Sequence, residues 1–317
     1  MATIPWTFTP FPPLPPGFLA NTLFYNATST ASNVTYQISL SYPFEWGPSD
    51  LPTTQITNKT ALTVYVTDGN ALAATAADHL KRRKPVDPSQ PDALVVGIGY
   101  PLTDSIYALR QRSIDFGAPI PGDPVPWGAD DFIDFIDGSL RPWVRDTVFP
   151  GVEFSRDAVY GHSSGGLFVA YALITRPDLF DTYIAASPSL TLMNGTVLAN
   201  VTRRLGDGME IPGEVPDFGQ GANSTTDYDL AKPAVFLGYG ELENYPVRKR
   251  TQTEAEFQAR RALLQRFSPG KPTHELYDKL VGSGRMRDVV IKEFLGEDHA
   301  AVGGAALLEG VNYFLDW

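Results

Sequence analysis

The chain has 317 residues, of which 43% are hydrophobic and 19% are charged, so it is globular and forms one large or two smaller domains. Its net charge of −11 argues against binding to nucleic acid or to an anionic membrane surface, because both attract basic patches. No apolar run is long enough to span a bilayer. The absence of cysteine excludes disulfides, thiolate catalysis and cysteine-based metal sites.

The cues to cellular location conflict. Residues 1–6 lack the basic and apolar regions of a signal peptide, so we expect a cytoplasmic protein. Secretion is the alternative, because six asparagines lie in Asn-x-Ser/Thr sequons: Asn26, Asn33, Asn58, Asn194, Asn200 and Asn223.

The first part of the chain predicts an α/β unit. Prolines between residues 7 and 18 indicate an extended N-terminal arm, assigned to residues 1–33. Alternation over 34–43, which ends in proline, predicts an edge strand. The β-branched apolar runs 61–70 and 92–101 predict strands buried on both faces, and the segment 71–83 between them predicts a helix.

Strands and helices continue to alternate. We expect strands at 157–161, 182–189, 233–241 and 287–299, and helices at 130–147, 166–176, 251–267 and 300–317. The polar, Gly- and Asn-rich segment 191–232 lacks strong periodicity and predicts a cap over a site or a mobile loop. The pattern therefore predicts one α/β domain over residues 1–317, with a mostly parallel central sheet flanked by helices.

The stretch YGHSSGG, residues 160–166, contains the pattern G-x-S-x-G. It lies between a predicted strand and a predicted helix, which is the setting of the nucleophile elbow of α/β hydrolases. The alternative is a glycine-rich turn with an N-capping serine. Because of the strand before and the helix after, we interpret Ser163 as a nucleophile and the backbone N–H of Ser164 as an oxyanion donor.

A serine nucleophile needs a base, and four histidines are candidates. His162 lies inside the elbow, where its side chain diverges from that of Ser163. His79 lies in a predicted helix before a basic run, and His274 lies in a predicted loop. His299 follows a strand end before the last helix, where the order Ser, acid, His places the base, so we predict His299.

The acid is expected between these two residues, after a strand. Glu243 lies three residues after Gly240, near the end of the predicted strand 233–241, and we predict that it orients His299. Glu241 is the second candidate for this role. The alternatives are that both glutamates are solvated acids of a loop, or that the site is a Ser–His dyad without an acid. Asp298 adjoins His299 in sequence, which makes a contact with Nδ1 geometrically awkward.

The second oxyanion donor of such a site comes from the loop after an early strand. Here that loop is Asp68-Gly69-Asn70, which could also be a plain turn. We expect the backbone N–H of Gly69 or Asn70 to serve.

With these residues in place, the chain from about residue 34 to 317 resembles the putative-esterase (esterase D-like) family of α/β hydrolases, which includes the iron-siderophore esterases. The resemblance is carried by VTDGN, VVGIGYP, RQRSIDF, GHSSGGLFVAYAL, RPDLFDTYIAASPSL, GYGELE and LGEDHAAV in family order. It implies an α/β-hydrolase fold, catalytic roles for Ser163, His299 and Glu243, and oxyanion amides from Gly69 and Ser164. It also implies that Arg112 lies near the pocket and contacts substrate.

The predicted function is that of a serine esterase that works through an acyl-enzyme and needs no cofactor or metal. The resemblance implies that the substrate is a small molecule, an ester-linked ferric siderophore. Because the chain is acidic, a hydroxamate of the fusarinine type is favoured over an anionic catecholate. The alternatives are a general carboxylesterase acting on acetyl, acyl-thioester or aromatic esters, and a non-catalytic binding protein on this scaffold.

Overall fold

The computed structural model describes residues 6–10, 20–47, 52–103, 105–120, 122–206 and 232–316. Their contacts divide the chain into two compact units. The first comprises Met1–Phe116, Gly128–Val159 and Val311–Trp317, and the second comprises Gly117–Trp127 and Tyr160–Gly310. Strand β6 (Gly151–His162) and helix α10 (His299–Leu315) each have residues in both units.

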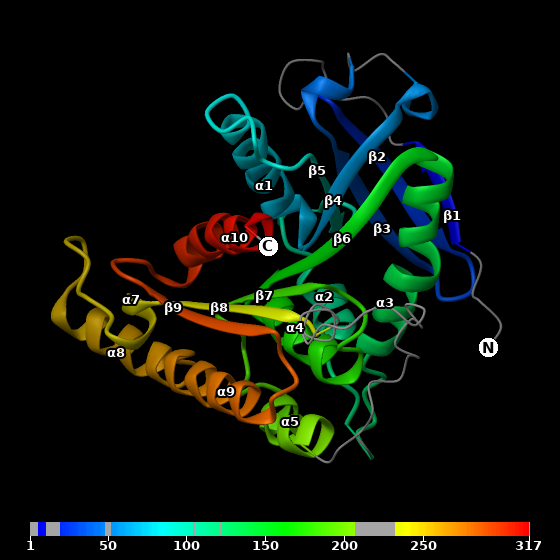
Figure 1. Cartoon of the computed structure of the whole chain (residues 1–317). Coiled ribbons are helices and arrows are strands. Elements are labelled where there is room, and N and C mark those ends of the chain that lie inside the picture. Colours follow the sequence, from blue (N-terminus) through cyan, green and yellow to red (C-terminus); the bar gives the residue numbers. More distant parts are fainter. Residues whose placement is uncertain are drawn as a thin grey trace. The chain divides into compact units, whose positions relative to one another are not determined.

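The first unit is a sheet with helices α1 (Gly69–Arg83), α2 (Leu109–Asp115) and α3 (Ala129–Phe135) (Figure 1). Its strands are β1 (Trp6–Pro10), β2 (Thr22–Ser29), β3 (Val34–Ser41), β4 (Thr57–Thr67) and β5 (Ala93–Gly99). β4 and β5 are parallel, and β3, β2 and β1 extend the sheet beyond β5 in antiparallel pairs. All seven residues of β5 are buried, as expected for a strand covered on both faces.

Close approach and aromatic packing hold this unit together. A Cβ at Gly69 would lie 2.6 Å from the backbone carbon of Gly97, so only glycine lets the start of α1 approach β5 this closely. The ring of Trp6 lies 4.3 Å from that of Phe135 and 5.4 Å from that of Tyr36, between centroids. These contacts attach β1 to α3 and β3, in addition to its pairing with β2.

The second unit contains the parallel strands β7 (Thr182–Ala186), β8 (Ala234–Gly240) and β9 (Asp288–Phe294), joined in that order. Its helices are α4 (Ser164–Thr175), α5 (Thr196–Gly206), α7 (Glu241–Asn244), α8 (Glu254–Gln265) and α9 (Gly270–Ser283). Ten consecutive residues of α4 are buried, so this helix is covered all round. The helix predicted at 251–267 is α8, which begins at Glu254 instead of residue 251, and Thr253 and Glu256 form a reciprocal capping box at its start.

Several sequence predictions need correction. The strand at 34–43 is not an edge strand, because β3 pairs with β2 on one side and β5 on the other. His274 lies in helix α9 rather than in a loop. Within 130–147, α3 ends at Phe135 and π-helical turns follow.

The segments predicted as an arm and a cap are described only in part. Within residues 1–33, β1 and β2 are strands of the sheet, and residues 11–19 lie outside the described residues. Within 191–232, residues 196–206 form α5, which packs against α9 (Figure 1). Residues 207–231 lie outside the described residues, so the cap stays a prediction, as does the single domain.

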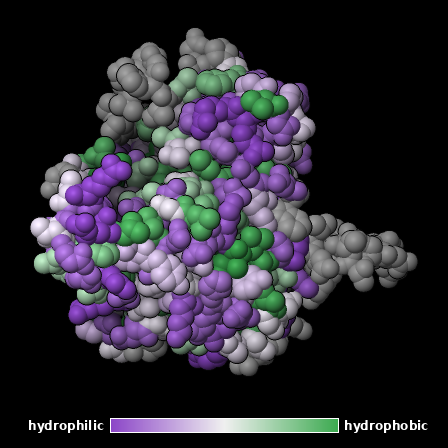
Figure 2. Space-filling view, turned by 90° about the vertical axis from the view of Figure 1, so that its left-hand side faces the viewer, coloured by the Kyte–Doolittle hydropathy of each residue, from purple (hydrophilic) through white to green (hydrophobic). Residues whose placement is uncertain are grey.

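On the face drawn in Figure 2, the described residues are mostly hydrophilic, and the hydrophobic ones lie in separate groups. Across the described parts of the chain, no helix combines the length and the apolar character that crossing a membrane requires.

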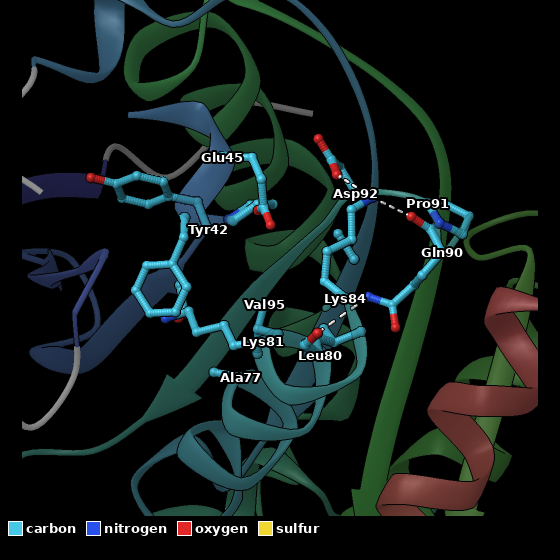
Figure 3. Close-up of a pocket in the computed structure, with 14 residues that line it drawn as sticks. Tyr42, Glu45, Ala77, Leu80, Lys81, Lys84, Gln90, Pro91, Asp92 and Val95 are labelled. Atoms are coloured by element: carbon cyan, nitrogen blue, oxygen red, sulfur yellow. Dashed lines mark hydrogen bonds and ion pairs between the residues drawn. The ribbon is translucent and has the colours of Figure 1, made fainter. Parts of the chain in front are cut away.

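A half-buried lysine, Lys81, is among the residues that line a cavity in the first unit (Figure 3). Lys81 lies on α1, and its Nζ donates to the carbonyl of Ala20 (2.6 Å) and to the hydroxyl of Ser41 (2.7 Å). Burial lowers the pKa of Lys81 from 10.5 to about 8, against the opposing effect of Asp78. Lys84, one turn along the helix, forms an ion pair with Asp92 at 3.0 Å.

We therefore expect Lys81 to make stability depend on alkaline pH. Between about pH 8 and 10.5 the unfolded chain binds a proton at this lysine that the folded chain has released, so the free energy of unfolding rises with pH. Discounted for partial exposure, the rise is about 1–2 kcal/mol. Denaturant unfolding of the wild type and Lys81→Met, at steps from pH 7 to 11, should show the wild type gaining that amount relative to the variant. Parallel curves would contradict this prediction.

Candidate active site

The turn between β6 and α4 holds Ser163 in an unusual backbone conformation, with φ 59° and ψ −116°. Its N–H donates to the carbonyl of Ala186 (3.0 Å), and its carbonyl accepts from the N–H groups of Leu167 (3.0 Å) and Ser189 (3.1 Å). Among the described residues, its hydroxyl contacts His299 and Ser189 and caps no amide of α4. The interpretation as a helix-capping serine therefore does not describe this turn.

The glycines around Ser163 are required by close packing of the turn on itself. A Cβ at Gly161 would lie 2.1 Å from the carbonyl oxygen of Gly165, which no side chain tolerates. A Cβ at Gly166 would lie 2.9 Å from the carbonyl oxygen of Ala186. The local sequence thus forms a sharp strand-to-helix turn, as the G-x-S-x-G pattern predicts.

Within the second unit, the structure brings Ser163, His299 and Glu243 together. Ser163 Oγ lies 2.9 Å from His299 Nε2, and His299 Nδ1 lies 2.5 Å from Glu243 Oε1. His299 is the first residue of α10, and its side chain is 47% exposed, whereas that of Glu243 is 5% exposed. A carboxylate only accepts hydrogen bonds, so this contact favours the tautomer with hydrogen on Nδ1, which leaves Nε2 free to accept from Ser163.

The second carboxylate oxygen of Glu243 is also held. Oε2 accepts from the backbone N–H of Gly240 (2.6 Å) and from the hydroxyl of Ser187 (2.5 Å). No local sequence pattern indicated Ser187, which follows strand β7. Glu241 is placed differently, because its carboxylate accepts from the N–H of Gly296 (2.9 Å). The structure thus brings Glu243, rather than Glu241, to the histidine.

The remaining histidines have other surroundings. His162 is buried, and its ring lies 4.6 Å from that of His299, between centroids. His79 Nε2 lies 2.7 Å from Asn312 Oδ1, and His274 Nε2 lies 2.9 Å from the hydroxyl of Tyr239. Among the described residues, neither His79 nor His274 forms a ring contact with His299.

Asp298 caps helix α10, whose first residue is His299. Its Oδ1 accepts from the N–H groups of Ala300 (3.1 Å) and Ala301 (3.2 Å). This contact fixes the start of α10, and therefore the backbone position of His299.

The predicted oxyanion amides all lie at helix N-termini. Ser164 is the first residue of α4 in the second unit, and Gly69 and Asn70 are the first residues of α1 in the first unit. The first amides of a helix have no partner within it and face the positive end of the helix dipole. Asn70 is fixed by its side chain, which accepts from the N–H of Tyr100 (2.7 Å) and donates to the carbonyl of Tyr100 (2.8 Å).

Arg112 holds the residue before those amides. Its guanidinium donates to both carboxylate oxygens of Asp68, at 2.8 and 2.7 Å, and both residues are buried. Asp68 has φ 51°, a left-handed conformation at the junction of β4 and α1. The guanidinium of Arg112, which was predicted to contact substrate, is therefore already bound to Asp68 within the first unit, where it supports the loop 68–70.

A buried carboxyl lies close to that loop. Burial raises the pKa of Asp115 to about 6, although hydrogen bonds from Gln111 (2.8 Å) and from the hydroxyl of Tyr100 (3.1 Å) oppose the shift. Tyr100 also forms hydrogen bonds with Asn70, so Asp115 is connected to the loop 68–70 through Tyr100. The described residues contain no group of three or more histidine or carboxylate side chains placed to hold a metal ion.

The family model described as "Putative esterase" matches residues 50–276 of the sequence. The chain belongs to this esterase family. It is therefore a hydrolase of ester bonds, and the predicted enzyme class is confirmed.

Two relatives match most of the esterase. A siderophore enterobactin esterase of Emericella nidulans is 37% identical, over 97% of both chains. A siderophore triacetylfusarinine C esterase of Aspergillus fumigatus is 32% identical, over 89% of both chains. Among solved structures, the siderophore hydrolase EstA from Aspergillus nidulans matches with a TM-score of 0.81 at 35% identity, over 96% of this chain and 98% of its own. The predicted α/β-hydrolase fold is thereby confirmed.

The contacts of the two glutamates lead to a direct test. Glu243→Gln should lower the kcat of ester hydrolysis by about 10³- to 10⁴-fold, because the amide can favour the wrong histidine tautomer. Glu241→Gln should change kcat less than tenfold, because its contact is to the N–H of Gly296. Steady-state kinetics on one ester would compare them. Equal small effects would leave a Ser–His dyad in place of the three-residue arrangement.

Proposed function

We propose that the esterase hydrolyses the ester bonds of a ferric siderophore through an acyl-enzyme. The observation that carries the mechanism is the continuous hydrogen-bond chain from Ser163 through His299 to the buried Glu243. The observation that supports the substrate class is the similarity, over nearly the whole chain, to relatives named as siderophore esterases.

The reaction follows from these contacts. As Ser163 Oγ attacks the ester carbonyl, His299 Nε2 accepts its proton, and the carboxylate of Glu243 stabilises the imidazolium that forms. The backbone N–H of Ser164 binds the negative oxygen of the tetrahedral intermediate. The resemblance to the family assigns the second donor to Gly69 or Asn70.

Collapse of this intermediate breaks the ester C–O bond, and His299 returns the proton to the departing alkoxide. Water then attacks the acyl-serine with the same base and acid assistance, which releases the carboxylic acid and restores Ser163. Iron enters only as part of the substrate.

Charge favours one kind of siderophore. A chain of net charge −11 repels a trianionic ferric catecholate but not a neutral or cationic hydroxamate. Arg112 does not offset this, because its charge is matched by Asp68. We therefore propose a hydroxamate ester of the fusarinine type as the preferred substrate. The cytoplasmic location expected from the sequence stays a prediction.

The nucleophile is tested by substitution and labelling. Ser163→Ala should abolish hydrolysis, with a loss of about 10⁴-fold or more in kcat, while the fold and thermal midpoint are retained. A fluorophosphonate probe, followed by peptide mass spectrometry, should label Ser163 and leave the adjacent Ser164 unlabelled. Turnover by Ser163→Ala at the wild-type rate would remove the whole mechanism, and label on Ser164 would move the elbow by one residue.

The substrate class is tested with salt as the variable. The kcat/KM of a ferric hydroxamate triester, a ferric catecholate triester and an uncharged p-nitrophenyl ester should be measured at ionic strengths of about 0.01 M and 1 M, where the Debye lengths are about 30 and 3 Å. We expect the hydroxamate to be preferred at low salt, and the preference to shrink at high salt. The uncharged ester controls for other effects of salt.

Other results would redirect the proposal. Faster turnover of the catecholate at low salt would mean that local positive charge, for example at the exposed Arg110, outweighs the net charge. The hydroxamate preference would then be wrong, and the esterase mechanism would stand. Turnover of the p-nitrophenyl ester alone would favour a general carboxylesterase.

A further inference from the structure

Ser187 is a buried serine in a conformation that serine rarely adopts. It follows strand β7, is 1% exposed, and has φ 40°. Glycine and asparagine tolerate positive φ better than serine does, so a serine here indicates that its hydroxyl is used. The hydroxyl donates to Oε2 of Glu243 at 2.5 Å, and the N–H of Ser187 donates to the carbonyl of Gly238 at 2.7 Å.

The loop 186–189 that contains Ser187 also supports the nucleophile. The carbonyl of Ala186 accepts from the N–H of Ser163, and the N–H of Ser189 donates to the carbonyl of Ser163. One short segment therefore contacts both the N–H and the carbonyl of Ser163, and through Ser187 it also contacts the carboxylate of Glu243.

Two donors on Oε2 determine how Glu243 faces the histidine. With Gly240 N–H and Ser187 Oγ on one oxygen, the other oxygen is left for His299 Nδ1. Glu243 is only 5% exposed, so water does not readily replace a lost donor.

We propose that Ser187 is a positioning residue, which holds the Glu243 carboxylate directed at His299. The inference rests on the proposed function and deepens it, because it makes the orienting unit of the esterase a glutamate and a serine rather than a glutamate alone. Ser187 acts through Glu243 and does not itself contact the reacting ester.

Loss of the hydroxyl should affect catalysis more than substrate binding, because Ser187 contacts the carboxylate that orients His299 and not the ester. Without this donor the Oε2 atom of Glu243 keeps only the N–H of Gly240, so the carboxylate is held less firmly toward His299.

The experiment compares Ser187→Ala with Ser187→Gly. Both lose the hydroxyl, but glycine also relieves the positive φ, so it should unfold at a higher temperature than the alanine variant. We expect kcat to fall by about 10- to 100-fold in both, with a smaller change in KM. Thr182→Val is the matched control: Thr182 is fully buried on β7, its hydroxyl has no partner among the described residues, and its kcat should be unchanged.

Two results would overturn the inference. One is a wild-type kcat in Ser187→Ala. The other is recovery of activity in Ser187→Gly, which would show that the backbone and not the hydroxyl matters. Ser163→Ala, run alongside, separates the failures: if it retains activity the proposed function fails, and if it is inactive while Ser187→Ala behaves as wild type, only the role of Ser187 fails.

Discussion

The backbone of Ser163 is the constraint on which the active site depends. A non-glycine residue with φ 59° and ψ −116° lies outside the regions that L residues prefer, at a cost of about 1–3 kcal/mol. Three backbone hydrogen bonds and the close contact of Gly161 with Gly165 hold it there. The strained turn directs the hydroxyl toward His299 instead of the amides of α4. Without this turn the same serine would be a helix cap.

The second unit supplies the other groups from the carboxyl ends of its parallel strands. Ser187 follows β7, Glu243 follows β8, and His299 follows the turn after β9. Because β7, β8 and β9 are joined in register, groups far apart in sequence meet at one edge, and Ser163 reaches His299 across 136 positions. All residues of β7 and β8 are buried, and these two strands carry the segments that begin at Ser187 and Glu241.

The sequence predicted the parts of this site that have local signatures. The elbow is a strand–turn–helix pattern, and chain order pointed to His299 and Glu243 without knowledge of packing. Ser187 has no such signature, because its role arises from a partner 56 positions away. In the fold, the proline that ends segment 34–43 suggested an edge strand, but Pro43 lies beyond β3 and leaves its hydrogen bonds intact. Helix α5 was missed because its polar composition obscured the buried positions Val197, Val201 and Leu205, spaced four apart.

The position of Arg112 suits a role in supporting the loop 68–70 better than a role in binding substrate. A substrate anion would have to displace Asp68, whose two oxygens occupy the guanidinium fork in a buried setting, and would leave that carboxylate buried and unpaired. The pair is therefore better suited to fixing the loop that begins at Gly69 than to binding a ligand. Asn70 is fixed on the other side by both backbone groups of Tyr100. Because its charge is matched by Asp68, Arg112 offers no free positive charge to an anionic ester, and for this reason we expect the net charge to govern substrate choice.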